Sequence, residues 1–157
     1  MILFLSTVAH AQSVCTKLYS ALDLSSNIDS ATIAFVQQDP EKLRTHIEQL
    51  ESMIPCLKDP IEPDIAASLH ITEGMFFAIS GETLKAKQSF AIGKAIDSDI
   101  KIPTYIYPSG HPIQTAFEST PAATRKPVDV SKDQEWYFDG MSQMGRPLDT
   151  PTIFQVT

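Results

Sequence analysis

The stretch GETLKAKQSFAIGKAIDSD, residues 81–99, decides how this chain folds. Its apolar residues, among them Phe90 and Ile96, recur at helical spacing, which predicts an amphipathic helix. Ala86 and Gly93 are small and let another helix come close to this one. We therefore expect the stretch to pack against a neighbouring helix and to contribute no catalytic residue.

The helices around this stretch follow from the same periodicity. A helix is expected over residues 65–80 and ends at Gly81, because glycine is favoured where helices stop. It would form a hairpin with the quoted stretch. Upstream, residues 27–38 also show helical spacing of apolar residues. A further helix begins with Asp39 as its N-cap and ends before Pro55, because proline interrupts helices.

The chain changes character after the second hairpin. Residues 101–112 contain three prolines, which exclude a long helix and predict an extended strap over the hairpin. A short helix is expected over residues 112–120, followed by a linker over residues 121–134. The segments EWYFDG, residues 135–140, and TIFQVT, residues 152–157, predict two short strands.

The predicted fold class is therefore mainly α: antiparallel helical hairpins with a Pro-rich irregular strap and a short C-terminal β-like segment. We expect a signal-peptide remnant (1–11), a helical domain (12–120), a linker (121–134) and a β-like tail (135–157). A lone two-stranded hairpin is marginal in water. The tail therefore either packs on the helices or begins a module that this chain leaves incomplete.

The N-terminal sequence predicts export. MILFLSTVAHAQ is an apolar run with a small-x-small pattern near its end, which indicates a signal peptide cut after Ala11. The alternative is a buried N-terminal helix or strand. The run is too short to span a bilayer, so no transmembrane segment is expected in the mature chain. In an oxidising compartment Cys15 and Cys56 are expected to form a disulfide, with two free buried thiols as the alternative.

The charge of the chain argues against two classes of partner. The sequence has a formal net charge of −7 and no Lys/Arg cluster beyond Arg125-Lys126. Nucleic-acid binding depends on neutralising phosphates with basic side chains, so nucleic acid is not expected as a partner. The acidic balance also disfavours adsorption to anionic lipid headgroups.

Small and aromatic residues within residues 67–98 stand where the two helices of a tetratricopeptide repeat touch. They are Gly74, Phe77, Gly81, Ala86, Phe90 and Gly93, with the closing pair Ile96-Asp97. The stretch resembles one such repeat and departs from it at His70, Glu73 and Ser98. The resemblance implies a scaffold or peptide-binding module, since enzymes are rare in this family. The positions with which the family grips peptides are not matched, so no ligand residue follows.

The tail WYFDGMSQMGRPLDTPTIFQV, residues 136–156, is similar to the small extracytoplasmic β modules called PEGA domains. It shares with them a strand, an Asp-Gly turn, a proline-containing loop and a second strand. Their defining motif is absent. The resemblance implies a location in the cell envelope, which agrees with the export signal, and we expect a periplasmic or outer-envelope protein.

Few residues could carry chemistry. His70 and Glu73 lie one turn apart on one expected helix and could hold a metal or act as acid and base. No third ligand stands at a suitable spacing, so we interpret them as part of a polar helix face. Ser109 and His111 lack the third group and oxyanion hole of a catalytic pair and are interpreted as a turn. We predict no catalytic, cofactor-binding or metal-binding residue and no enzyme.

Five aromatic residues in the irregular and β-like segments are the remaining candidates: Tyr105, Tyr107, Trp136, Tyr137 and Phe138. Aromatic side chains in such segments either cover the core or form a partner-binding surface. The sequence leaves both interpretations open. The second would give the protein its contact surface.

The sequence thus predicts a non-catalytic, exported protein–protein interaction or scaffold module of the cell envelope. Its partner would be another envelope protein or peptide segment, received in a helical groove or on an aromatic patch. One alternative is a small ligand- or metal-binding protein or enzyme in which His70, Glu73 and His111 converge in a pocket. Another is a fragment whose function lies beyond the C-terminus.

Overall fold

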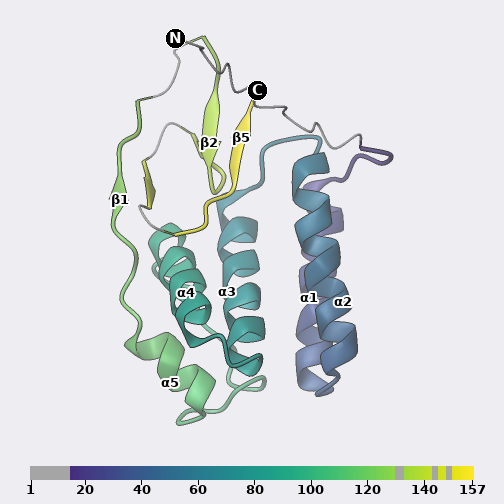
Figure 1. The fold of residues 1–157 in the computed structure, drawn as a ribbon, viewed down its shortest axis with the longest axis vertical. Coiled ribbons are helices and arrows are strands. Elements are labelled where there is room, and N and C mark those ends of the chain that lie inside the picture. The colour runs from purple at the N-terminus through teal and green to yellow at the C-terminus, as the bar shows by residue number, and fades with distance from the viewer. Residues whose placement is uncertain (1–14, 130–132, 143–144, 148–149) are drawn as a thin grey trace, which may run out of the picture.

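The computed structural model describes residues 15–129, 133–142, 145–147 and 150–157 and shows helical hairpins below a small sheet (Figure 1). The expected signal peptide, residues 1–11, lies outside the described residues. The elements are α1 (Ala21–Val36), α2 (Pro40–Met53), a 3-10 turn η1 (Ile54–Cys56), α3 (Pro63–Ile79), α4 (Thr83–Ile96), α5 (Pro112–Ser119), β1 (Arg125–Lys126), β2 (Trp136–Phe138), β3 (Met141–Ser142), β4 (Arg146–Pro147) and β5 (Phe154–Val156). The prediction of a mainly helical protein with a short C-terminal β region is confirmed.

In the first hairpin, formed by α1 and α2, a side chain caps the N-terminus of each helix. Ser20 and Asp23 form a capping box, in which the Asp23 carboxylate accepts a hydrogen bond from the Ser20 backbone N–H at 2.8 Å. This cap starts α1 six residues before the periodic stretch at 27–38 that the sequence indicated. Asp39 caps α2, as predicted, and its carboxylate accepts from the Lys42 N–H at 3.0 Å.

The second hairpin, α3 with α4, packs through the small residues singled out in the sequence. A Cβ on Gly74 would lie 2.5 Å from the Phe90 ring, and a Cβ on Gly93 would lie 2.6 Å from the Ile71 side chain. Glycine at both positions therefore sets the separation of the two helices. The expectation that residues 81–99 act as a packing helix is confirmed.

The short helix α5 closes the far side of this hairpin. Phe117 packs edge-on against Phe90 with ring centroids 5.5 Å apart. Lys94 of α4 donates to the backbone carbonyls of Phe117 at 2.6 Å and of Thr120 at 2.8 Å. These carbonyls belong to the last turn of α5 and to its C-cap, where helices leave acceptors without partners. The lysine thus ties the C-terminus of α5 to α4.

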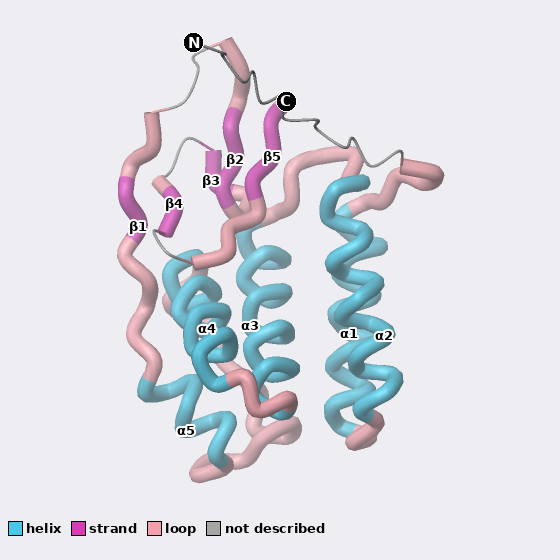
Figure 2. The backbone as a smooth tube through the Cα atoms, in the orientation of Figure 1, coloured by secondary structure: helices cyan, strands magenta, loops and turns pink. Residues whose placement is uncertain are grey.

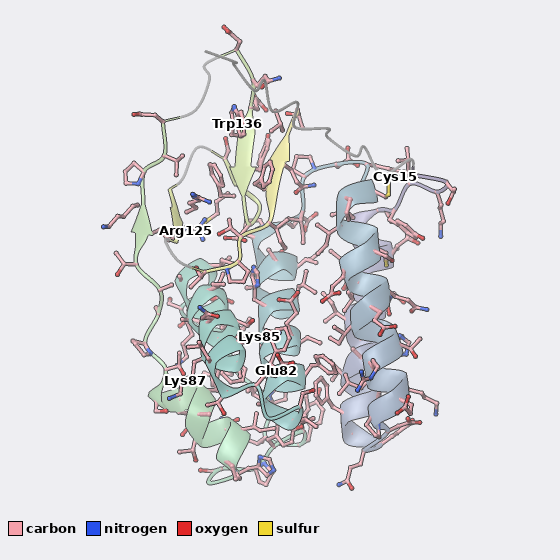
Figure 3. All side chains as sticks on the ribbon, viewed as in Figure 1. Cys15, Glu82, Lys85, Lys87, Arg125 and Trp136 are labelled. Atoms are coloured by element: carbon pink, nitrogen blue, oxygen red, sulfur yellow. A yellow bond between two sulfur atoms is a disulfide. The ribbon has the colours of Figure 1, made fainter. Side chains whose placement is uncertain are left out.

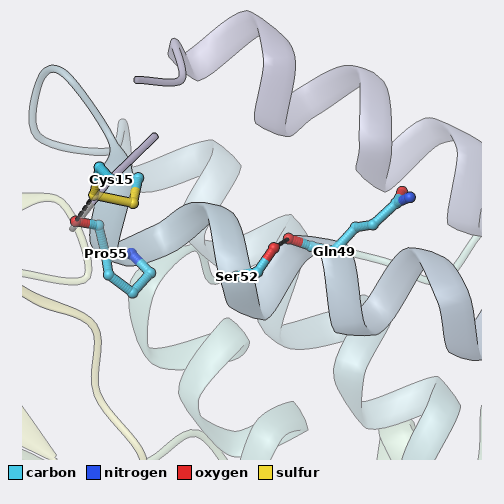
Figure 4. The surroundings of a disulfide bond; sticks show 5 residues. Cys15, Gln49, Ser52 and Pro55 are labelled. Carbon is cyan, nitrogen blue, oxygen red and sulfur yellow. Dashed lines mark hydrogen bonds between the residues drawn. A yellow bond between two sulfur atoms is a disulfide. The ribbon is translucent and has the colours of Figure 1, made fainter. Parts of the chain in front are cut away.

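The predicted disulfide between Cys15 and Cys56 is present, with Cα atoms 5.6 Å apart, and lies beside Pro55 (Figure 4). The backbone next to it is paired as well. The Tyr19 N–H donates to the Cys56 carbonyl at 2.9 Å, and the Lys58 N–H donates to the Tyr19 carbonyl at 2.9 Å. In the chain-entropy view a bridge across such a loop stabilises the fold by about 3–4 kcal/mol.

The C-terminal strands form a three-stranded antiparallel sheet of order β3-β2-β5, and β1 pairs with β4 (Figure 2). Asp139 and Gly140 join β2 to β3 with φ angles of 52° and 79°. Positive φ at both central residues is the geometry of a type I′ hairpin turn, for which Asp-Gly is favoured. The two predicted strands therefore exist and pair with each other as β2 and β5.

The segment expected to be a linker, residues 121–134, contacts the rest of the molecule in its described part. The Ala123 N–H donates to the Ala91 carbonyl of α4 at 2.8 Å. Two residues later β1 begins, and Arg125 reaches across to the sheet (Figure 3). The described part of the segment thus runs from α5 along α4 to the β region.

Candidate functional site

A buried polar network joins α3 to the C-terminal sheet. The two ring nitrogens of His70 contact carboxylates on opposite sides: Nε2 lies 3.1 Å from Asp139 and Nδ1 lies 3.3 Å from Glu73. The Arg125 guanidinium donates to the other Asp139 oxygen at 3.0 Å. His70 is 2% exposed and Asp139 is 0% exposed, so these charges are screened little by solvent.

Asp139 is held by the backbone as well as by the two cations. Its carboxylate accepts from the Ile153 N–H at 2.9 Å, and its own N–H donates to the Ile153 carbonyl at 2.7 Å. Arg125 also donates to the Phe138 carbonyl at 3.0 Å and to the Gly145 carbonyl at 2.7 Å. These bonds join the β2–β3 turn to β1 and to the residues before β5. Together with the contact between His70 and Asp139, they fasten the sheet to α3 and to β1.

The network determines the ionisation of His70. Burial alone would lower the pKa of the imidazole, but its hydrogen bonds to Asp139 and Glu73, with the charges of both carboxylates, raise that pKa to about 9. The ring is then an imidazolium at neutral pH, and both N–H groups donate. An imidazolium has no nitrogen lone pair with which to bind a metal or abstract a proton.

This geometry corrects the interpretation of His70 and Glu73 as part of a polar helix face. Glu73 does face solvent in part, but His70 is enclosed. His111 does not converge with them. It caps α5, stacks on Tyr107 with ring centroids 4.4 Å apart, and lines a different groove. Asp139 is the partner that sequence reasoning missed; its only signal was the Asp-Gly turn.

A cleft lies between β5 and the end of the first hairpin, next to this network. Its volume is about 600 Å³. One wall is the strand segment 151–156; the other contains Ile54, Pro55 and Leu57, and His70 and Glu73 contribute from α3. We call it the β5 cleft.

A second hollow lies at the opposite end of the helices, where α1 passes into α2. It measures about 480 Å³, and we call it the Tyr105 groove. Tyr105 is 72% exposed, and Val36 and Ile79 are about half exposed. Of the two interpretations left open for Tyr105, core cover is therefore wrong, because the strap turns at this residue and leaves its ring in solvent.

The five aromatic candidates do not form one surface. Tyr105 and Tyr107 line the Tyr105 groove, and the Tyr107 ring packs edge-on against Phe35 with centroids 6.4 Å apart. Trp136, Tyr137 and Phe138 form β2 in the sheet, where Phe138 is buried and its two neighbours are partly buried. Figure 3 shows Trp136 in the sheet, above the helices.

Comparison with known proteins gives no assignment: no protein-family model, curated protein or solved structure matches this chain. Among the described residues, no group of three or more His, Cys, Asp or Glu side chains has the arrangement of a metal site. Within the same part of the chain, no helix has the length and apolar character to cross a membrane.

Proposed function

We propose that this chain is a non-catalytic interaction module of an exported protein and that it holds a short apolar segment of a partner protein in the Tyr105 groove. One observation carries the proposal. Three large apolar side chains converge on the same hollow: Val36 and Ile79, which are about half exposed, and Tyr105, which is largely exposed. Exposed apolar residues scattered singly need no explanation, but a group that rims a hollow is typical of a binding surface.

The groove also favours a particular kind of partner segment. Its floor is apolar, with Phe35, Leu43 and Tyr107 among its lining residues, and suits one or two large apolar side chains. Asp39 lies at the rim, where its hydrogen bonds to the Lys42 backbone and side chain lower its pKa and keep it ionised. The Lys42 ammonium pairs with this carboxylate at 3.0 Å, so a basic residue next to the apolar anchor would be favoured mainly by the net charge of −7 of the whole chain.

Two further features support an exported scaffold. The Cys15–Cys56 disulfide suits an oxidising compartment, in agreement with the export signal in the sequence. The contacts of Gly74 with Phe90 and of Gly93 with Ile71 are of the kind that the resemblance to a tetratricopeptide repeat implies. The His70 network supports an enzyme or a metal-binding protein less well, since both nitrogens of its imidazole are already engaged.

The test is site-specific photo-crosslinking in the native cell envelope. The photoreactive residue benzoylphenylalanine replaces Tyr105 in one variant and Leu22 in the other. Leu22 is a matched control, because it is 78% exposed on α1 and lies outside the groove. We expect one dominant partner, identified by mass spectrometry, from position 105 and none from position 22.

The same partner, purified, should bind a Tyr105→Ala variant at least about tenfold more weakly, since aromatic anchors dominate such interfaces. Equal crosslinking from both positions, or no partner above background, would contradict the proposal.

A further inference from the structure

The strand β5 (Phe154–Val156) lies at one end of its sheet and, among the residues that the structure describes, pairs on one side only, with β2. Glu135 and Thr157 exchange two backbone hydrogen bonds, at 3.2 and 3.0 Å, and this shows which residue pairs of the antiparallel ladder are hydrogen-bonded. Hydrogen-bonded pairs alternate along such a ladder, so the next one is Tyr137 with Gln155. The backbone N–H and C=O groups of Phe154 and Val156 therefore point away from β2, toward the open edge.

The β5 cleft lies along this strand. Its far wall comes from η1 and the residues around it, and Figure 1 shows β5 between β2 and the first hairpin. The Gln155 side chain ties β5 to the loop before α3 by accepting from the Ile61 N–H at 2.7 Å. Phe154, which is largely exposed, and Val156 both line the cleft. The edge thus combines unpaired backbone groups with apolar side chains on a strand that is fixed in place.

The edge is short, at three residues, but it carries no protective side chain. Natural edge strands are commonly guarded by lysine, proline or a bulge, whereas β5 consists of Phe154, Gln155 and Val156. Negative charge lies close by. Burial raises the pKa of Glu51, and the nearby carboxylates of Glu73 and Glu48 raise it further. Carboxylates therefore lie where α2 meets α3, with Lys85 near them, and Glu73, which contacts the enclosed His70 through one carboxylate oxygen and is 16% exposed, lines the cleft itself.

We propose that β5 receives an extended segment of another protein as an additional strand of the sheet. The backbone of that segment pairs with the outward groups of Phe154 and Val156. Its alternate side chains enter the β5 cleft; they are apolar except for one lysine or arginine on the same face, which lies near Glu73. This surface is separate from the Tyr105 groove, so the inference goes beyond the proposed function and stands or falls independently of it.

The test uses a defined probe, the peptide acetyl-Thr-Val-Thr-Val-Thr-Lys-amide, titrated into the protein; its two valines and its lysine share one face of the strand. Trp136 is the only tryptophan in the sequence and lies directly opposite Val156, so its fluorescence reports on this edge. Two further peptides carry N-methyl groups on one or the other set of alternate amides. We expect one set to weaken binding at least about tenfold and the other to leave it within about twofold, because only alternate amides face β5. Equal binding of both peptides, or no binding of the unmodified probe, would overturn the proposal.

A protein variant tests the same contact from the other side. Val156→Pro removes an outward N–H, and edge strands tolerate proline because that N–H takes no part in the ladder. Its matched control, Val156→Thr, keeps the N–H. We expect the proline variant to bind about tenfold more weakly and the threonine variant to bind nearly normally. If circular dichroism shows that the proline variant does not fold, the methylated peptides decide alone.

Three more measurements distinguish strand addition at β5 from binding in the Tyr105 groove and from dimer formation. Tyr105→Ala should bind the probe as the unchanged chain does, which separates the two surfaces. Replacing the lysine of the probe by glutamate should weaken binding and reduce its dependence on salt. If sedimentation shows a dimer that the peptide does not dissociate and that Val156→Pro abolishes, a second copy of the chain occupies the edge and the proposal is wrong.

Discussion

In the helical half of the molecule each helix packs on its neighbour in sequence, α1 on α2 and α3 on α4, whereas the C-terminal sheet depends on contacts between distant residues. His70 meets Asp139 across 69 positions, and Gln155 meets Ile61 across 94. The strands themselves are two or three residues long. The helices therefore have local sources of stability, such as caps and hairpin packing, that the sheet lacks. We infer that the sheet is the part of the molecule that opens first.

The largest effect is expected from Asp139→Asn. The change leaves His70 and Arg125 without their shared counter-charge in a buried site, and breaking a buried ion pair costs about 3–5 kcal/mol. Urea unfolding should be followed by Trp136 fluorescence for the sheet and by far-ultraviolet circular dichroism for the helices. We expect the fluorescence transition to move to lower urea than the circular-dichroism transition.

The control for this variant is Asp29→Asn, which removes the same charge from an exposed position on α1. Surface changes of this kind usually stay within about 0.5 kcal/mol. If Asp139→Asn moved both transitions equally, the sheet and the helices would unfold as one unit, and the contrast between the two halves would not hold.

The two halves also differ in how much of them the sequence predicts. Asp39 marks the start of α2 and Gly81 the end of the α3 region, because capping and glycine preferences act within a few residues. The sequence has two cysteines, so the disulfide had one possible pairing within the chain. These features could be predicted because each rests on local chemistry or on simple counting.

The polar network could not be predicted in the same way. A histidine and a glutamate one turn apart on a helix usually face solvent, and nothing near His70 in sequence indicates that a turn 69 residues later covers it. The Tyr105 groove and the β5 cleft could not be predicted either. Periodicity assigned Tyr105 and Trp136 to irregular or β-like segments, but only the packing of those segments separates the two residues into different surfaces.

The second prediction concerns pH and again distinguishes the sheet from the helices. The pKa of His70 is raised from an ordinary 6.5 to about 9 in the folded state. The protonated form is thus favoured by folding, so its contribution is fully present below pH 6.5 and is lost as the pH rises through 9. A shift of this size corresponds to about 3 kcal/mol.

The free energy of unfolding from urea titrations, with Trp136 fluorescence as the probe, should therefore fall between pH 6.5 and pH 10. A His70→Gln variant serves as the control, since glutamine can donate a hydrogen bond but does not titrate. We expect it to be less stable than the unchanged chain at pH 6.5 and to lose much less stability on going to pH 10. A parallel decline in both proteins would assign the pH dependence to other groups.

The smallest effect is expected in the helical half, from Gly74→Ala. Alanine favours a helix over glycine by about 1 kcal/mol, but its Cβ would lie 2.5 Å from two atoms of the Phe90 ring. That ring is buried and packs against Phe117, so it cannot move away freely. Overpacking costs about 1–3 kcal/mol, which leaves a net destabilisation of about 1 kcal/mol. Because the α3–α4 hairpin also supports the sheet, the urea transitions followed by fluorescence and by circular dichroism should shift together, unlike in Asp139→Asn.

The control is Leu84→Ala, at an exposed position of α4, which should move neither transition. A stabilised Gly74→Ala protein would show that the two helices can separate to accept the methyl group, and that glycine does not set their distance.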